Sequence, residues 1–223
     1  MINNFTMPSL RSRKLAEEIG WHIGDGSMNS YLNKGNLKGL YSLRGHIKDD
    51  LSHYQQRVIP AYSHLFNINI HLNKMPSYGV CGFQVWSDDL IKFKTKLGLP
   101  LGKKTHIEIP KFILIDRSLY SSFVRGFFDT DGCLYLEHKN KRLYPRIQIS
   151  NVSSNLMNSL WQILNDLGFR ATIYTEKVNR YNWNNKTVVV LRGHEQVKKW
   201  FKIIKPGNPK HNNKYYFYLN KSS

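Results

Sequence analysis

The stretch RGFFDTDGCLYL, residues 125–136, places two aspartates one residue apart where helical spacing gives way to strand alternation. Before it, apolar residues recur at four-residue steps behind Asp116, which is typical of a helix with one buried face. An Asp-Gly pair is also an ordinary helix-stop or turn signal, so one copy alone would mark only the end of that helix. A second copy of the pattern in the chain shows which of Asp129 and Asp131 belongs to a repeated feature.

The same order of elements occurs in the first part of the chain, in RSRKLAEEIGWHIGDGSMNSYL, residues 11–32. There, too, apolar residues recur at four-residue steps, Ser12 is a candidate N-cap, and an Asp-Gly pair ends the helix. Asp25 and Asp131 hold matching places, whereas the counterpart of Asp129 is Ile23. Only Asp131 of the two aspartates therefore belongs to the repeated pattern.

Similar elements follow both copies: a strand pair, a helix, a second strand pair and an amphipathic segment. In the first copy NINIHL, residues 67–72, is one of the predicted strands. The sequence thus predicts an α+β fold of two αββαββα repeats, residues 1–106 and 118–223, joined by a linker at 107–117. Units of this length are too long for a solenoid and indicate duplication of a small domain about an approximate two-fold axis.

Small residues recur at every fourth position in both motif helices. Since Gly inside a helix costs about 1 kcal/mol relative to Ala, a duplicated stripe needs a reason. Small residues in line let two helices approach closely; the alternative is one helix crossing tightly over its own sheet. The duplication favours the two helices packing on each other at the repeat interface, which would bring both Asp-Gly pairs together. The stripe consists of Ala16, Gly20 and Gly24 in one helix and Ser122, Gly126 and Thr130 in the other.

Two carboxylates at adjacent helix C-termini repel each other, because that end of a helix carries the negative pole of its dipole. A divalent cation is the natural group to offset this repulsion. Cys81, Cys133 and the nine histidines lack the spacing of a zinc site. No apolar run approaches a membrane span, and no signal-peptide core is present, so we expect a soluble, intracellular protein that is not secreted and binds no membrane.

The charge of the chain is strongly basic, with 33 Lys and Arg against 15 Asp and Glu, a net charge of +18. Such an excess favours a polyanionic partner, of which nucleic acid is the commonest, over a basic protein without one. The polar faces of the predicted strands carry long donors and acceptors interleaved with aromatic rings, as a ribbon that reads the major groove would. Solvated sheet faces would alternate in the same way, and the charge favours DNA.

By alternation we expect the following residues to face the DNA. In the first repeat they are Ser27, Asn29, Tyr31, Asn33, Lys38, Ser42, Arg44, Asn69, His71, Asn73, Tyr78, Gln84 and Trp86. In the second repeat they are Tyr135, Glu137, Lys139, Arg142, Tyr144, Arg146, Gln148, Ser150, Arg170, Thr172, Tyr174, Glu176 and Arg180. Lysines in loops and at helix ends would then hold phosphates.

EIGWHIGDG, residues 18–26, and VRGFFDTDG, residues 124–132, resemble the two signature motifs of the LAGLIDADG homing endonucleases. The resemblance covers essentially the whole chain. The second motif matches closely, whereas the first departs from the family at Glu18 and Ile23. The resemblance implies a monomeric hydrolase whose two antiparallel sheets form a saddle over a long double-stranded DNA target. It also implies Mg²⁺-dependent cleavage of both strands with 3′ overhangs, an intron-encoded origin, Mn²⁺ as a substitute and Ca²⁺ supporting binding without cleavage.

Carried over by the same resemblance, Asp25 and Asp131 match the metal-binding acids, assisted by the backbone carbonyls of Gly24 and Thr130. Asn151 matches the polar residue that closes the second strand and organises water.

In the first repeat the place of that polar residue falls at Gly45 or His46, so we include His46 among the candidate catalytic residues. The basic residue near the site corresponds to Lys104, with Lys103 as an adjacent rival, and to Lys210 in the second repeat.

Two other classes of function remain open at this point. Members of the family that act as RNA maturases bind intron RNA and assist splicing, and others bind DNA without cutting it. Retention of both acids argues for nuclease activity. The absence of a leading Cys or Ser and of a final His-Asn disfavours an intein host.

Overall fold

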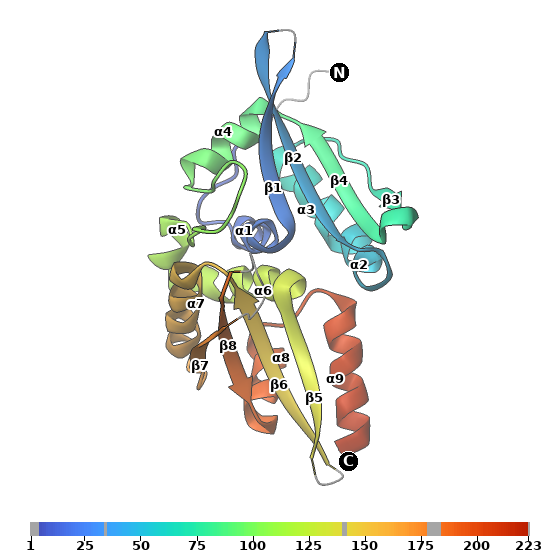
Figure 1. Ribbon diagram of the computed structural model, residues 1–223, viewed down its shortest axis with the longest axis vertical. Coiled ribbons are helices and arrows are strands. Elements are labelled where there is room, and N and C mark those ends of the chain that lie inside the picture. The colour runs from blue at the N-terminus through green and yellow to red at the C-terminus, as the bar shows by residue number, and fades with distance from the viewer. Residues whose placement is uncertain (1–4, 34, 140–141, 178–183, 223) are drawn as a thin grey trace.

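The computed structural model describes residues 5–33, 35–139, 142–177 and 184–222. The two repeats lie at opposite ends of an elongated molecule and meet at its centre, where α1 (Arg13–Asp25) and α6 (Tyr120–Asp131) lie side by side (Figure 1). From there β1 (Gly26–Asn33) and β5 (Gly132–Lys139) run outward in opposite directions to the two hairpin ends. The predicted two-repeat α+β architecture is confirmed.

The first repeat contains one four-stranded antiparallel sheet, in the order β1-β2-β4-β3. Ser12 caps α1, because its side chain accepts a hydrogen bond from the Leu15 amide. The elements after α1 are β1 (Gly26–Asn33), β2 (Asn36–His46), α2 (Ile47–His53), the π-helical turn η1 (Tyr54–Val58), α3 (Ile59–Phe66), β3 (Asn73–Met75), the 3₁₀ turn η2 (Pro76–Tyr78), β4 (Val80–Trp86) and α4 (Asp88–Lys96).

The second repeat follows the same αββαββα order and adds a C-terminal helix, with the sheet order β5-β6-β8-β7. The connection between the repeats carries the short helix α5 (Lys111–Leu114) and the 3₁₀ turn η3 (Arg117–Leu119), which leads directly into α6. The elements after α6 are β5 (Gly132–Lys139), β6 (Arg142–Asn151), α7 (Ser154–Asp166), β7 (Thr172–Glu176), β8 (Lys186–Arg192), α8 (His194–Ile203) and α9 (Pro209–Ser222).

The predicted strand at 67–72 is wrong, because that segment forms no ladder. Ile68 and Ile70 are buried, so its alternation is real. However, β3 pairs with β4 only from Asn73 to Met75, and residues 67–72 run past the rest of β4 without pairing. The alternation of apolar and polar residues at 67–72 therefore reflects the burial of one face of the segment, and not pairing with a neighbouring strand.

The C-terminal helix α9 is an element that the sequence analysis did not predict. It lies beside β5 (Figure 1) and is anchored to α8 by aromatic contacts. The rings of Phe201 and Tyr215 stack with centroids 3.9 Å apart, and Tyr218 shares a hydrogen bond of 3.0 Å with His194. Its sequence lacks a clean apolar stripe, so these contacts with another helix, rather than periodicity, define it.

The stripes of small residues lie where α1 and α6 touch. A Cβ atom added at Gly20 would lie 2.5 Å from the Phe123 carbonyl oxygen, and one at Gly126 would lie 2.0 Å from that of Glu17. Side chains do not fit at such distances, so the two backbones are in direct contact. At the C-terminal ends Gly24 lies against the side chain of Thr130. The predicted packing of the motif helices on each other is confirmed.

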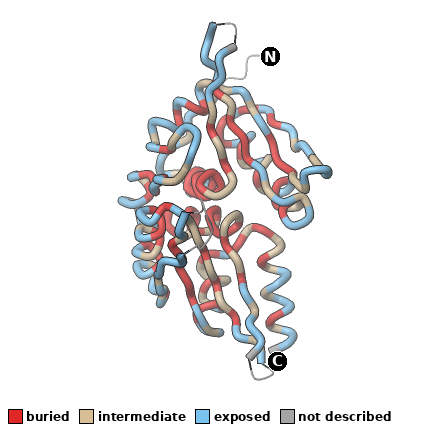
Figure 2. The backbone as a smooth tube through the Cα atoms, in the orientation of Figure 1, coloured by how far each residue is buried: buried red, intermediate tan, exposed pale blue. Residues whose placement is uncertain are grey.

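One face of each sheet is covered by helices, and the other face is open (Figures 1 and 2). Met28, Tyr41 and Phe83 point from the first sheet into the core, and Ile147 and Val189 do so from the second. The hairpin ends are largely exposed (Figure 2). Among the described residues, none of the helices is both long enough and apolar enough to cross a membrane.

Glu18, which stands where the resemblance led us to expect an apolar residue, forms a buried ion pair inside the first repeat. Lys94 Nζ lies 2.5 Å from Glu18 Oε1, and both side chains are fully buried. Tyr62 also donates a hydrogen bond to Glu18, and its hydroxyl lies 2.5 Å from that of Tyr41. A charge at this position of α1 is thus tolerated because α4 supplies its partner.

This pair predicts a specific pattern of unfolding free energies. Lys94→Met and Glu18→Leu, made singly, should each cost about 3–5 kcal/mol, because each leaves a buried charge without its partner. The double variant should recover most of that loss. Urea unfolding measures all three. Lys38→Met, which breaks the exposed pair with Asp88, is the control and should cost at most about 1 kcal/mol. A double variant as unstable as the sum of the single ones would contradict this account.

Candidate active site

Asp25 and Asp131 are the last residues of α1 and α6, and the packing of these helices brings them together at the centre of the molecule. A Cβ atom on Gly24 would lie 3.3 Å from Asp131 Oδ1, so the second carboxylate sits against the backbone of the first helix. Burial and the neighbouring charges of Asp131 and Asp50 raise the pKa of Asp25 to about 7. Burial raises the pKa of Asp131 to about 6. Both raised pKa values mean that the negatively charged carboxylates are not fully stabilised in the metal-free protein and would be stabilised by added positive charge.

Lys104 supplies part of that charge from the segment after α4. Its Nζ donates hydrogen bonds to the carbonyl oxygens of His22, Ile23 and Gly24 at 3.1, 2.8 and 2.8 Å, which caps the C-terminal end of α1. Burial lowers the pKa of the Lys104 ammonium, while Asp131 and Asp25 oppose this shift. Lys103 is exposed, so of the two rivals it is Lys104 that the structure brings to the carboxylates.

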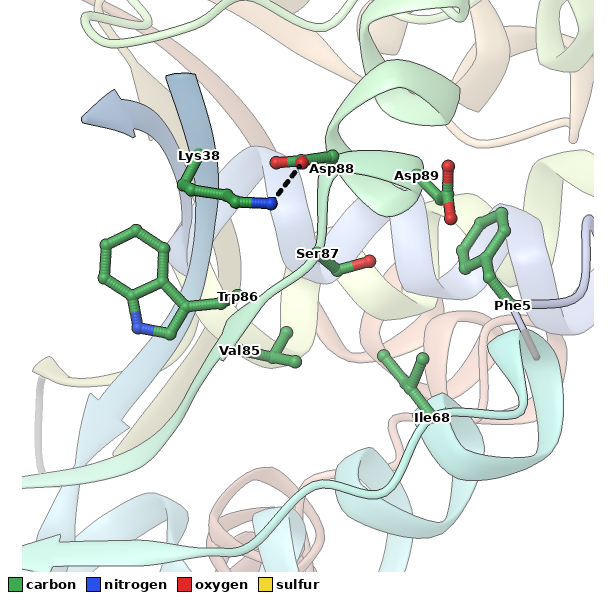
Figure 3. Close-up of a pocket in the computed structure, with 8 residues that line it drawn as sticks. All are labelled: Phe5, Lys38, Ile68, Val85, Trp86, Ser87, Asp88 and Asp89. Carbon is green, nitrogen blue, oxygen red and sulfur yellow. Dashed lines mark hydrogen bonds and ion pairs between the residues drawn. The ribbon is translucent and has the colours of Figure 1, made fainter. Parts of the chain in front are cut away.

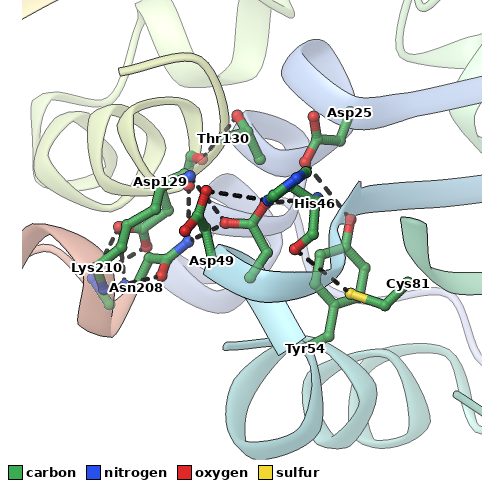
Figure 4. Close-up of polar contacts among 12 residues, drawn as sticks. Asp25, His46, Asp49, Tyr54, Cys81, Asp129, Thr130, Asn208 and Lys210 are labelled. Carbon is green, nitrogen blue, oxygen red and sulfur yellow. Dashed lines mark hydrogen bonds and ion pairs between the residues drawn. The ribbon is translucent and has the colours of Figure 1, made fainter. Parts of the chain in front are cut away.

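Lys210, from the beginning of α9, reaches across the interface to the first repeat. Its Nζ lies 2.8 Å from Oδ1 of Asp50 in α2, which also accepts a hydrogen bond of 2.7 Å from Asn208 (Figure 4). Burial opposes the charged form of Asp50, but these partners outweigh it and hold the pKa of that carboxyl below its usual range. The charge of Lys210 also lowers the pKa values of Asp25 and Asp131.

Asp129 has a different task from Asp131. Its Oδ1 accepts hydrogen bonds from the backbone amides of Gly207 and Asn208 at 2.9 and 3.0 Å, and its carbonyl accepts one from the Asn208 side chain at 3.1 Å. Burial raises the pKa of Asp129 to about 7 in spite of the two amides. Asp129 therefore anchors the loop that precedes α9, and this loop places Lys210.

The polar residue at the end of the second strand differs between the repeats. Asn151 Nδ2 donates to Asp131 Oδ2 at 3.4 Å. In the register of the strands Gly132 pairs with Ile149 and Gly26 pairs with Leu43, so the counterpart of Asn151 is Gly45.

The expectation for His46 is corrected by the same register, which places this residue one position beyond the counterpart of Asn151. Its half-exposed imidazole lies 3.0 Å from Oδ2 of Asp49, an ion pair when the ring is protonated, and not against either carboxylate of the site.

Sequence reasoning missed two residues of the site, Asp50 and Tyr54. Tyr54 is buried and donates a hydrogen bond of 3.5 Å to Asp25 Oδ2 (Figure 4). Both residues come from the helical stretch after β2, outside the motifs. Asp50 lies in α2, and Tyr54 begins the π-helical turn η1, whose spacing differs from that of an α-helix.

The strand residues expected to contact DNA lie on the open faces of the sheets. Cross-strand pairs such as Ser27 with Ser42 and Tyr31 with Lys38 share one face, as do Tyr135 with Arg146 in the second sheet. The same face carries Asn29, Arg44, Asn73, Gln84 and Trp86 in the first repeat and Glu137, Arg142, Tyr144, Gln148, Ser150, Thr172, Tyr174 and Glu176 in the second.

Several of these expected residues lie elsewhere or are engaged. Ser42 is buried, and Arg146 forms an ion pair of 2.5 Å with Glu137. In the second sheet Val188 and Val190 face the same side as Tyr174 and Thr172, so the middle of that face is apolar. Asn69, His71 and Arg170 are exposed but lie outside the strands, and Tyr78 lies in the turn η2. Arg180 lies outside the described residues. The side chains of Asn33 and Lys139, at the ends of their strands, are also not described.

A pocket of about 470 Å³ lies at one end of the first sheet, where β4 leads into α4 (Figure 3). It is lined by residues of β2, β4 and the start of α4, where Lys38 pairs with Asp88 at 3.5 Å. None of its lining residues belongs to the carboxylate pair, so this pocket is not the candidate active site.

The carboxylate pair has the donor chemistry of a hard divalent cation such as Mg²⁺, which prefers oxygen ligands. In the part of the chain that the structure describes, no group of three or more His, Cys, Asp or Glu side chains is placed to hold a metal ion. An ion at Asp25 and Asp131 would thus need further oxygens, from the carbonyls of Gly24 and Thr130 or from a bound phosphate. The Gly24 carbonyl already accepts from Lys104 and keeps one lone pair.

Comparison with known proteins finds similarity at the level of a domain and of the fold. Residues 118–205 match the model of the LAGLIDADG-like domain. The uncharacterized protein MJ0314 of Methanocaldococcus jannaschii is 32% identical over 66 residues, 30% of this chain and 25% of that protein. The ribonucleoside-diphosphate reductase NrdEB subunit alpha of Bacillus subtilis is 28% identical over 76 residues, 34% of this chain and 7% of its own length. The matched segment thus spans a quarter or less of each of these relatives.

Solved structures resemble nearly the whole chain. A mesophilic variant of the homing endonuclease I-DmoI superposes with a TM-score of 0.61 at 20% identity, covering 88% of this chain and 98% of that one. The LAGLIDADG homing endonuclease I-GzeII, in complex with its DNA target, gives 0.55 at 12% identity over 91% and 87% of the two chains. The chain therefore carries a LAGLIDADG-like domain in its second repeat and has the single-chain, two-repeat fold of the LAGLIDADG homing endonucleases.

Proposed function

We propose that this protein is a site-specific DNA endonuclease of the homing type, encoded by an intron and acting as a monomer. It would hydrolyse both strands of a long duplex target and leave 3′ overhangs. The observation that carries this proposal is the pair Asp25 and Asp131, held side by side at the two-fold interface between two open sheets. Lys104 and Lys210 approach the pair from opposite repeats.

Each group of the site has a definite task in such a reaction. Asp25 and Asp131 would hold a Mg²⁺ ion, replaceable by Mn²⁺, which would supply the Lewis acidity that activates water and neutralises charge on the phosphate. The ammonium groups of Lys104 and Lys210 add positive charge where negative charge develops in the transition state. Asn151 orients Asp131 through its hydrogen bond of 3.4 Å.

The open sheet faces would bind the target. Their exposed donors and rings, such as Arg44, Gln84 and Tyr144, suit base edges in the major groove. The net charge of +18 supports binding to the phosphate backbone, which makes affinity strongly dependent on salt.

The decisive experiment exposes the purified protein to a large randomised duplex library, in Mg²⁺ and in EDTA, and sequences all cut ends. We expect cuts only with the metal, at one long motif, with 3′ overhangs. An absence of cutting, together with tight and salt-sensitive retention of DNA or RNA, would instead indicate a binding protein or an RNA splicing cofactor of the same fold.

On the selected target, Asp25→Asn and Asp131→Asn should each abolish cleavage. The substitution keeps the size of the side chain but removes the charge that a metal ion needs. Binding in Ca²⁺, measured by fluorescence anisotropy, should stay within about threefold of wild type, because affinity comes mainly from phosphate and sheet contacts. Loss of binding together with cleavage would contradict these roles.

The raised pKa values predict how metal binding depends on pH. Asp25 and Asp131 have pKa values of about 7 and about 6 in the metal-free protein, so each must release a proton when a cation binds. Mn²⁺ affinity, measured by calorimetry without DNA, should therefore rise about tenfold or more between about pH 5.5 and about pH 7.5. These pKa values lie above those of the unfolded chain. As the pH rises over this range, the free energy of unfolding of the metal-free protein should therefore decrease more than that of Asp25→Asn. A pH-independent affinity would refute the prediction.

A further inference from the structure

The two halves of the carboxylate site are built differently, and the following inference rests on the proposed function. In the second repeat Asn151, at the end of β6, donates to Asp131. The equivalent position in the first repeat is Gly45, which has no side chain. Asp25 therefore needs another polar partner, and the structure provides one from a helix.

Tyr54 occupies the space that a side chain at Gly45 would take. A Cβ atom added there would lie 2.8 Å from Tyr54 Cε2 and 2.8 Å from Asp50 Oδ2. The Tyr54 ring is buried, and its hydroxyl donates to Asp25 Oδ2 at 3.5 Å. Gly45 has no side chain, and the Tyr54 ring from the helix fills the space that such a side chain would need.

A π-helical turn is what directs this tyrosine at the site. Tyr54 and Tyr62 are eight residues apart, which in an α-helix would rotate them about 80° away from each other. Between them the Ile59 amide bonds to the Tyr54 carbonyl five residues back, and this wider turn removes most of that offset. Tyr54, Val58 and Tyr62 are all buried, as three residues that share one side of the helix would be.

We propose that Tyr54 is the positioning residue of Asp25 and the first-repeat counterpart of Asn151. Its hydroxyl orients the Asp25 carboxylate, as the Asn151 amide orients that of Asp131. A phenol donates a single hydrogen bond, whereas the amide Nδ2 can donate two. The two DNA strands are then cut under the control of different groups, so removing one group slows one strand more than the other.

The test compares Tyr54→Phe with Tyr120→Phe on a target duplex that carries a different label on each strand. Both variants lose one tyrosine hydroxyl, but that of Tyr120 donates to the Leu114 carbonyl in the repeat connection. Tyr54→Phe should slow the cutting of one strand about tenfold to a hundredfold and accumulate a nicked intermediate. Asn151→Ala should accumulate the nick in the opposite strand. Tyr120→Phe should cut both strands as wild type does.

Mn²⁺ affinity in the absence of DNA gives a second readout. Calorimetry should show binding about tenfold weaker in Tyr54→Phe and unchanged in Tyr120→Phe, with thermal unfolding confirming that both fold. Equal rates on both strands in Tyr54→Phe, with unchanged Mn²⁺ affinity, would overturn the inference while the nuclease function stands. If the wild type cuts no duplex, the proposed function fails. The Mn²⁺ affinities alone then decide the role of Tyr54.

Discussion

The direct contact between the backbones of α1 and α6 is the constraint on which the rest of the molecule depends. Gly20 and Gly126 permit it, since a Cβ atom at either place would collide with the backbone of the facing helix. Because Gly24 also packs against Thr130 one residue before each helix ends, the contact determines where Asp25 and Asp131 meet. It joins two small domains and builds the candidate active site in one step, so stability and chemistry share the same few residues.

Bringing two carboxylates together costs free energy, and the fold surrounds them with charge from both repeats. Lys104 caps α1 from its own repeat, whereas Lys210 arrives from the other end of the chain through the loop that Asp129 anchors. Asp50 receives Lys210 on the opposite side of the interface. This network ties the C-terminal segment to the first repeat, so the last helix of the chain also belongs to the interface. The residual repulsion between the acids is what suits the site to a divalent cation.

The repeat, its element order and the two metal-binding candidates could be predicted because a duplicated pattern is a local signal that occurs twice. Asp-Gly after a stripe of small residues is ambiguous once and informative when repeated. The prediction failed where contacts between distant segments, and not the local sequence pattern, determine the secondary structure. Residues 67–72 alternate as a strand does but find no partner, and α9 has no clean stripe yet is held by Phe201 and His194. Tyr54 was missed for the same reason, since a π-helical turn leaves no periodic trace.

By itself the sequence determined which residues repeat, which faces of the strands are polar, and that Asp131 and not Asp129 has a partner in the other half. These properties follow from spacing along the chain, which the two periodicities of helix and strand translate directly into faces. Only the tertiary structure decided which groups surround the carboxylates. It placed Lys104, and not Lys103, beside the carboxylates, and it made Gly45, and not His46, the counterpart of Asn151. It also brought Tyr54 to Asp25 in place of a strand side chain. All three outcomes depend on strand register and on contacts between distant segments. No local pattern encodes those contacts, because they exist only once the helices have packed.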